Sequence, residues 1–142
     1  MRLSTKGRYS TRLMIDIAVY GNDGFVFLKD VARRERISEK YLGHLVALLK
    51  NAGLIHTIRG PHGGVTLAKE ASEITLKDII LAVEGPILLD DEEEFLEHQG
   101  VCGDLILWKN IRERVSGSLD SYSLESMALE QKRKMEELNY AI

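Results

Sequence analysis

The chain contains very little cysteine, little proline and no long hydrophobic run. Its 142 residues include one Cys and two Pro. A single thiol cannot form an intramolecular disulfide, which argues against a disulfide-stabilised secreted protein and fits a reducing compartment. No apolar run approaches the roughly 18 residues of a membrane-spanning helix, and the N-terminal sequence lacks the apolar segment of a secretory signal. We therefore expect a cytoplasmic protein that does not enter the membrane.

The chain also lacks the sequence signatures of catalysis. No glycine-rich phosphate loop precedes a predicted helix, no nucleophile is paired with a base, and no metal-binding pattern is complete. The composition, 44% hydrophobic and 29% charged, is that of an ordinary folded protein. We therefore expect a binding protein and not an enzyme.

The charge of the chain is unevenly distributed. Residues 1–69 contain 12 Lys and Arg against 5 Asp and Glu, a net +7, whereas residues 70–142 contain 7 against 17, a net −10. A basic segment attracts nucleic-acid phosphates and an acidic segment repels them. A chance partition of solvated charge is the plainer alternative, but the asymmetry favours a DNA-binding part joined to a sensing or partner-binding part.

Hydrophobic periodicity predicts three helices in the basic segment. Apolar residues spaced by three and four predict a helix over 9–20, a second from Leu28 to about Glu35, and a third after the N-cap Ser38 that ends near Asn51. The second and third helices have the packing residues of a helix-turn-helix. These are Val31, the small Ala32, Ile37 in the turn, and Leu42 and Leu45 on the third helix.

Arg36 occupies the position in this turn where glycine is common. The backbone there can need a positive φ, which costs a non-glycine residue roughly 1 kcal/mol. The sequence therefore predicts some strain in the turn.

A β-hairpin follows the three helices. Two β-prone runs, 54–59 and 65–68, flank the glycine-rich turn at 60–64. These glycines either serve turn geometry alone or let the hairpin tip approach a sugar-phosphate backbone closely. Arg59, beside the tip, has the planar cationic head that suits a narrow minor groove. Together these elements predict a winged helix-turn-helix.

Three further features follow in the acidic segment. Thr75 and Asp78 have capping-box spacing at the start of a helix that Gly85 ends. A long amphipathic helix is predicted over 104–120, and a more polar helix begins near Ser123. The apolar stripe of the helix over 104–120 is too large to leave in water, which predicts a dimerisation helix. The fold class is therefore mainly α with a small β-hairpin wing and a long C-terminal dimerisation helix. We expect a DNA-binding domain at 1–87, an acidic loop at 88–103, and the dimerisation and C-terminal helices at 104–142.

Four motifs follow one another along the chain: MRLSTKGRY at 1–9, ISEKYL at 37–42, RGPHGG at 59–64 and ITLKDI at 74–79. Together they resemble the Rrf2 family of bacterial transcription regulators, which includes regulators of iron–sulfur biogenesis, nitric-oxide sensing and cysteine metabolism. The similarity extends without obvious gaps from residue 1 to about 87, and again from Cys102 to about Leu124.

The resemblance implies a homodimer in which each subunit presents its third helix and its wing to half of a near-palindromic operator. It implies that the third helix faces base edges, and Gly43 there replaces an acidic reader of the iron–sulfur regulators. We expect duplex DNA to be contacted by Lys6, Arg12, Ser38, Lys40, Tyr41, His44, Lys50, Arg59, His62 and Gly63. We expect the dimer interface to contain Leu105, Trp108, Ile111, Val115 and Leu119, for which a ligand-stacking role is the weaker alternative.

The cofactor chemistry departs from that of the cluster-binding relatives. Those relatives carry three cysteines before the long helix, whereas this chain keeps only Cys102. Positions of substitute ligands in relatives hold Arg8, Arg12 and Leu105, which cannot ligate iron. Since an iron–sulfur cluster needs about four soft ligands, we expect no cluster and no metal.

Cys102 leaves three alternatives open. It is a redox or ligand-sensing thiol, a small apolar residue packed under Trp108, or, with His98, Glu94 and Glu97, part of a site for a harder metal. The expected function is a sequence-specific DNA-binding regulator, most simply a homodimeric repressor. The alternatives are a regulator whose acidic half docks a metabolic enzyme, and a cluster- or metal-binding sensor.

Overall fold

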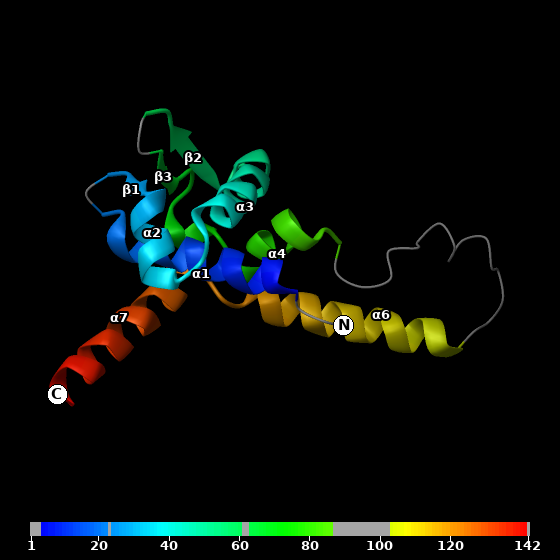
Figure 1. Ribbon diagram of the computed structural model, residues 1–142. Helices are drawn as coiled ribbons and strands as arrows, with labels where there is room; N and C mark the ends of the chain where they lie inside the picture. Colours follow the sequence, from blue (N-terminus) through cyan, green and yellow to red (C-terminus); the bar gives the residue numbers. More distant parts are fainter. Residues whose placement is uncertain (1–3, 23, 61–62, 87–102, 142) are drawn as a thin grey trace.

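The computed structural model describes residues 4–22, 24–60, 63–86 and 103–141. It confirms a mainly helical fold with a small antiparallel sheet (Figure 1). The elements in chain order are α1 (Thr5–Tyr20), β1 (Val26–Phe27), α2 (Leu28–Glu35), α3 (Glu39–Asn51), β2 (Ile55–Ile58), β3 (Gly64–Leu67), the 3-10 helix η1 (Ala71–Glu73), α4 (Leu76–Glu84), α6 (Gly103–Asp120) and α7 (Leu124–Tyr140).

Local capping begins several helices where the sequence predicts. The hydroxyl of Ser38 accepts a hydrogen bond from the backbone N–H of Tyr41 at 3.1 Å and caps α3. At α4, the backbone N–H of Asp78 donates to the Thr75 hydroxyl at 3.2 Å, and the Thr75 N–H donates to the Asp78 carboxylate at 3.0 Å. The predicted N-cap and capping box are therefore confirmed.

Helix α1 begins four residues before the predicted start. The cause is a contact of its first turn with Glu84, which lies 80 residues after Ser4 in the chain. The carboxylate of Glu84, at the end of α4, accepts hydrogen bonds from the Ser4 hydroxyl and from the backbone N–H of Gly7, the latter at 2.9 Å. An acidic group satisfies unpaired N–H groups at a helix N-terminus and interacts favourably with the helix dipole. A long-range contact thus fixes the first turn of α1.

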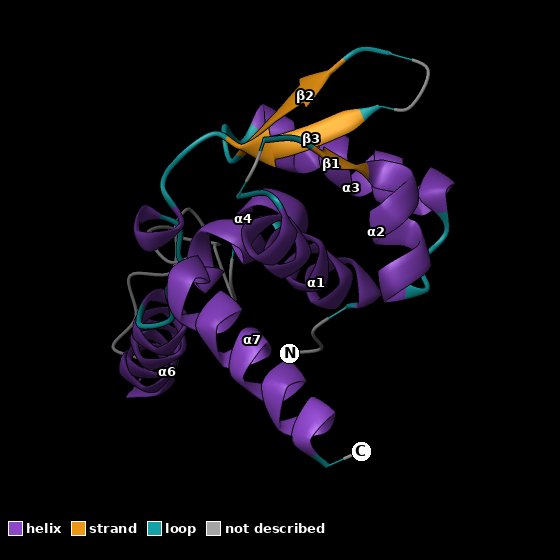
Figure 2. Ribbon diagram, turned by 90° about the vertical axis from the view of Figure 1, so that its left-hand side faces the viewer, coloured by secondary structure: helices purple, strands orange, loops and turns teal. Residues whose placement is uncertain are grey.

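The sheet has the strand order β1-β3-β2 and is antiparallel throughout. The predicted hairpin of β2 and β3 is confirmed, and the short apolar run before α2 adds β1 as a third strand. Buried Val26 of β1 pairs with buried Val65 of β3. These strands lie at one end of the molecule, and the C-terminal part of α7 extends away from the other end (Figure 2).

One core joins the N-terminal elements to the C-terminal helix. Helix α1 contacts α2, α3, α4 and α7, and its Leu13 and Ile17 are buried with Ile79 of α4 and Leu124 of α7. The backbone N–H of Leu124 also donates to the carbonyl of Ile74 at 2.7 Å. Helix α7 is thus packed into the winged-helix core, while the predicted segment boundary and most of the predicted loop at 88–103 lie outside the described residues.

Candidate nucleic-acid interface

The helix-turn-helix is formed by α2 and α3, packed as the sequence predicts. Val31, Leu42 and Leu45 are fully buried, and Ile37 in the turn is also buried. Ala32 is half-buried and packs against the same core. This packing holds α3 with one side in the core and leaves the other side available for a ligand.

The solvent side of α3 is polar and basic. Ser38, Lys40, His44 and Lys50 are all exposed. Gly43 adds a bare stretch of helix, since no heavy atom lies within 4 Å of the place where its Cβ would stand. Among the predicted DNA-contacting residues, the structure therefore places Lys40, His44 and Lys50 on α3 and Ser38 at its N-cap, all of them exposed. Such a helix has the composition of a major-groove reader.

Tyr41 differs from its neighbours on α3 because it is half-buried. Its ring packs edge-on against Tyr9 of α1, with ring centroids 5.9 Å apart, and lies 6.5 Å from the ring of His44. The guanidinium of Arg12 in turn lies 5.4 Å from the Tyr9 ring. Tyr41 and Arg12 thus belong to a contact network between α1 and α3 in addition to any role toward DNA.

Two ion pairs fix α2 against α1. Arg34 donates to the buried carboxylate of Asp16, and Arg12 donates from Nε to the Glu35 carboxylate at 3.1 Å and from Nη2 to the Glu35 carbonyl. The hydrogen bond with Asp16 raises the pKa of Arg34. Burial raises the pKa of Glu35, although the hydrogen bond from Arg12 opposes this shift. Lys6, the other predicted contact on α1, is half-buried.

The tip of the wing is open. Arg59 follows β2 and is exposed, and neither Gly60 nor Gly63 has a heavy atom within 4 Å of the place where a Cβ would stand. Gly64 is different, since its Cβ would lie 2.7 Å from Cγ1 of Ile58. Packing therefore disfavours a side chain at 64 but not at 60 or 63. His62 lies outside the described residues.

The predicted strain in the helix-turn-helix is confirmed. Arg36 has φ 54° and ψ 44°, in the left-handed region, and its backbone N–H donates to the carbonyl of Ala32 to end α2. The side chain of Arg36 is exposed.

The predicted dimerisation helix carries exposed apolar surface. Ile111, Val115 and Leu119 are half-buried on α6, while Trp108 is 46% exposed and the neighbouring Leu107 is 53% exposed. The side chain of Leu105 lies outside the described part of the chain. Helix α6 contacts α4, so part of the stripe is covered within the chain and the remainder faces solvent.

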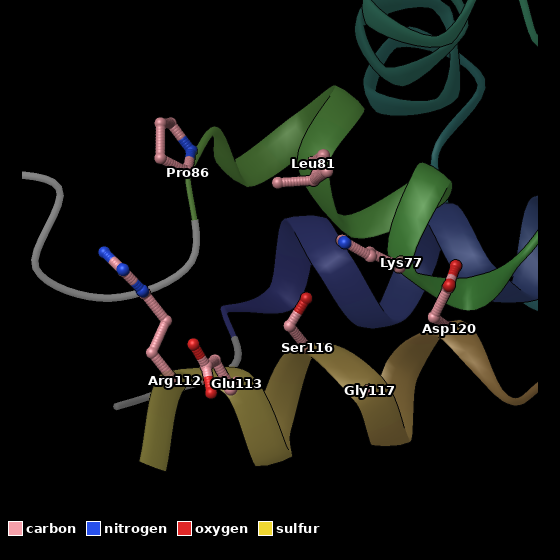
Figure 3. Close-up of a pocket in the computed structure, with 8 residues that line it drawn as sticks. All are labelled: Lys77, Leu81, Pro86, Arg112, Glu113, Ser116, Gly117 and Asp120. Atoms are coloured by element: carbon pink, nitrogen blue, oxygen red, sulfur yellow. The ribbon is translucent and has the colours of Figure 1, made fainter. Parts of the chain in front are cut away.

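A cleft of about 460 Å³ lies between α4 and α6 (Figure 3). Both signs of charge line it, from Lys77 and Arg112 and from Glu113 and Asp120, and Leu81 forms an apolar wall. Sequence reasoning missed this cleft because it arises only where two helices distant in the chain meet. Within the described ranges, no group of three or more His, Cys, Asp and Glu residues is placed to hold a metal ion.

No helix in the described part of the chain is both long and apolar enough to cross a membrane. Cys102, for which a sensing role is one of the three alternatives, falls in the range 87–102 that the structure does not describe. Among the described residues, the candidate site is the exposed polar surface of α3 together with the open tip of the wing.

Comparisons with known proteins agree with this architecture. A family model described as "Rrf2: Iron-dependent Transcriptional regulator" matches residues 3–130. The chain is 42% identical over 132 residues to the HTH-type transcriptional regulator CymR of Bacillus subtilis, with 90% of each protein covered. It is 37% identical over 132 residues to the HTH-type transcriptional regulator IscR of Photorhabdus laumondii, covering 89% of this chain and 79% of the relative.

Solved structures give the same result. CymR, the global cysteine regulator of B. subtilis, superposes with a TM-score of 0.70 at 41% identity, covering 90% of this chain and 96% of that one. IscR of T. potens superposes with a TM-score of 0.74 at 34% identity, covering 92% and 88%. The chain therefore belongs to the Rrf2 family and is a transcriptional regulator of the CymR and IscR type.

Proposed function

We propose that this regulator binds duplex DNA as a homodimer and represses transcription from a near-palindromic operator. The observation that carries the proposal is the exposed face of α3, where Ser38, Lys40, His44 and Lys50 stand clear of the core. Side chains near the start of such a helix reach base edges when it enters the major groove. A dimer that occupies a promoter blocks the polymerase without further machinery, which favours repression.

The wing supplies the second contact. Arg59 and the open glycines Gly60 and Gly63 present a cation and bare backbone at the hairpin tip. A narrow minor groove attracts arginine, and residues without side chains let a phosphate approach closely. The net +7 of residues 1–69 supports the same assignment, because phosphate binding dominates affinity for DNA.

The homodimer is proposed to form through α6. Trp108 and the neighbouring Leu107 are each about half exposed, at 46% and 53%. Exposed apolar residues that adjoin one another on one helix mark a surface for association. Together with the half-buried Ile111 and Val115 they give α6 an interface in which each copy meets the same surface of the other.

We propose that no iron–sulfur cluster controls this protein, although the family model is named for iron dependence. The donor set does not fit the group, because Cys102 is the only cysteine in the chain and such clusters need about four thiolate-type ligands. Another input must then shift the equilibrium between DNA-binding and non-binding states, and oxidation of Cys102 or a bound molecule are the candidates.

The experiment is selection of bound duplexes from a randomised pool, followed by affinity measurements on the selected and a scrambled sequence. Arg59→Ala should lose about 1 to 3 kcal/mol of binding on the selected duplex and less on the scrambled one. Lys50→Ala, a proposed phosphate contact, should weaken both duplexes evenly. Equal losses on both duplexes for both variants would refute this division of roles, and no enrichment of any sequence would refute the proposed function.

A further inference from the structure

We infer that Arg36 binds a DNA phosphate at the edge of the major groove, and that its strained backbone is retained for this contact. The inference rests on the proposed function, which names DNA as the partner but does not include Arg36 among the contacts.

The backbone of Arg36 is unfavourable for arginine. It is the one non-glycine residue with a positive φ in the described ranges. The conformation is imposed by the fold, because the N–H groups of Arg36 and Ile37 both donate to the carbonyl of Ala32 to end α2, and Ile37 must then enter the core. A glycine would adopt the same conformation without the steric cost of a Cβ.

The side chain of Arg36 brings the fold no compensating contact. Other arginines of this region are paired with carboxylates: Arg12 with Glu35, Arg33 with Asp30 and Arg34 with Asp16. Arg36 is exposed and forms no ion pair or side-chain hydrogen bond with any residue that the structure describes. An arginine that strains the backbone and remains unpaired points to a partner outside the chain.

The position of Arg36 identifies that partner. It stands two residues before Ser38, the N-cap of α3, so its Cα lies within about 7 Å of the start of the recognition helix. In a docked helix-turn-helix the first helix crosses the DNA backbone and the second enters the major groove. The turn between them therefore passes the edge of the groove, where phosphates lie. Guanidinium groups bind phosphate oxygens through paired charge-assisted hydrogen bonds.

The test separates strain from charge with three variants of the full-length protein. Arg36→Gly and Arg36→Asn both relieve the strain and remove the cation, since Asn tolerates the left-handed region, whereas Arg36→Lys retains both the charge and the strain. Thermal unfolding and DNA affinity are measured for each, on the selected duplex and on a scrambled duplex of equal length.

Arg36→Gly should raise the Tm by a few degrees and yet weaken binding about tenfold on both duplexes, and Arg36→Asn should do the same. The slope of log Kd against log salt should fall by about 2, one phosphate for each subunit. Arg36→Lys should keep most of the affinity. If wild type binds DNA and Arg36→Gly binds equally well, the phosphate contact is overturned while the proposed function stands. If wild type binds no duplex, both are overturned.

Discussion

The guanidinium of Arg34 donates two hydrogen bonds to the carboxylate of Asp16, from Nε at 2.9 Å and from Nη2 at 2.7 Å. The Asp16 side chain is fully buried, and the same guanidinium lies 4.0 Å from the centre of the Tyr20 ring. Because Asp16 belongs to α1 and Arg34 to α2, this pair sets the orientation of the helix-turn-helix against the central helix.

Arg34→Met should destabilise the protein by about 3 kcal/mol, because it leaves a buried carboxylate without a partner. Urea unfolding followed by circular dichroism measures the loss. Arg33→Met is the matched control: Arg33 forms an exposed pair with Asp30 at 3.5 Å, and its removal should change stability by less than about 0.5 kcal/mol. Similar losses for the two variants would show that the pair with Asp16 has no special structural role.

Substitution by alanine should lower the stability of the protein at Gly64 of the wing but not at the adjacent Gly63. At Gly64 a Cβ would lie 2.7 and 2.8 Å from the Ile58 side chain and 3.1 Å from Cβ of Phe25, so Gly64→Ala should cost about 1 to 3 kcal/mol of stability. Gly63→Ala meets open space and should leave stability within about 0.5 kcal/mol of wild type. The affinity of Gly63→Ala for DNA should nevertheless fall if the wing tip approaches a phosphate closely, and an unchanged affinity would remove Gly63 from the interface.

Ile111→Glu and Val115→Glu should each convert the protein to monomers, because a carboxylate within the α6 interface would be desolvated without a partner. Sedimentation velocity measures the change. Asn110→Glu provides the control, since Asn110 is exposed. It lies nine residues, or two and a half helical turns, before Leu119 and is therefore on the opposite side of α6 from that residue. Dimers that survive both substitutions would place the interface on another surface.

Protein purified without oxygen should be colourless, contain no stoichiometric iron or sulfide, and still bind DNA. The reason is that one cysteine per chain cannot supply the ligands of a cluster. Equimolar iron and sulfide with broad visible absorption would contradict this prediction. In the colourless protein, a peroxide response of DNA affinity that disappears in Cys102→Ser would identify Cys102 as the sensor, whereas no response in either protein would leave it a packing residue.

Features that depend on neighbouring residues were predictable from the sequence. The caps at Ser38 and Thr75 and the hairpin follow from local residue preferences, and the structure has each of them. The positive φ of Arg36 was predictable from its position in the helix-turn-helix, where glycine is common, although arginine itself disfavours that conformation. The exposed side of α3 was predictable for the same reason, because its opposite side carries the buried Leu42 and Leu45.

Features that depend on residues distant in the chain were not predictable. The early start of α1 requires the carboxylate of Glu84, and the burial of Leu124 requires α7 to return to the core. The engagement of Arg12 by Glu35 and the cleft between α4 and α6 also arise only after the helices have packed. Hydrophobic periodicity shows which side of a helix is buried, but not which helix covers it.

The salt dependence of DNA affinity tests the central claim most directly. Wild-type protein is titrated onto a duplex selected from the pool, at salt concentrations from about 50 to 200 mM. With the +7 of residues 1–69 doubled in a dimer, log Kd should rise linearly with log salt, and six or more phosphate contacts would weaken binding about 10³-fold over this range. An affinity that stays flat over the same range, for the selected and for the scrambled duplex, would contradict the account.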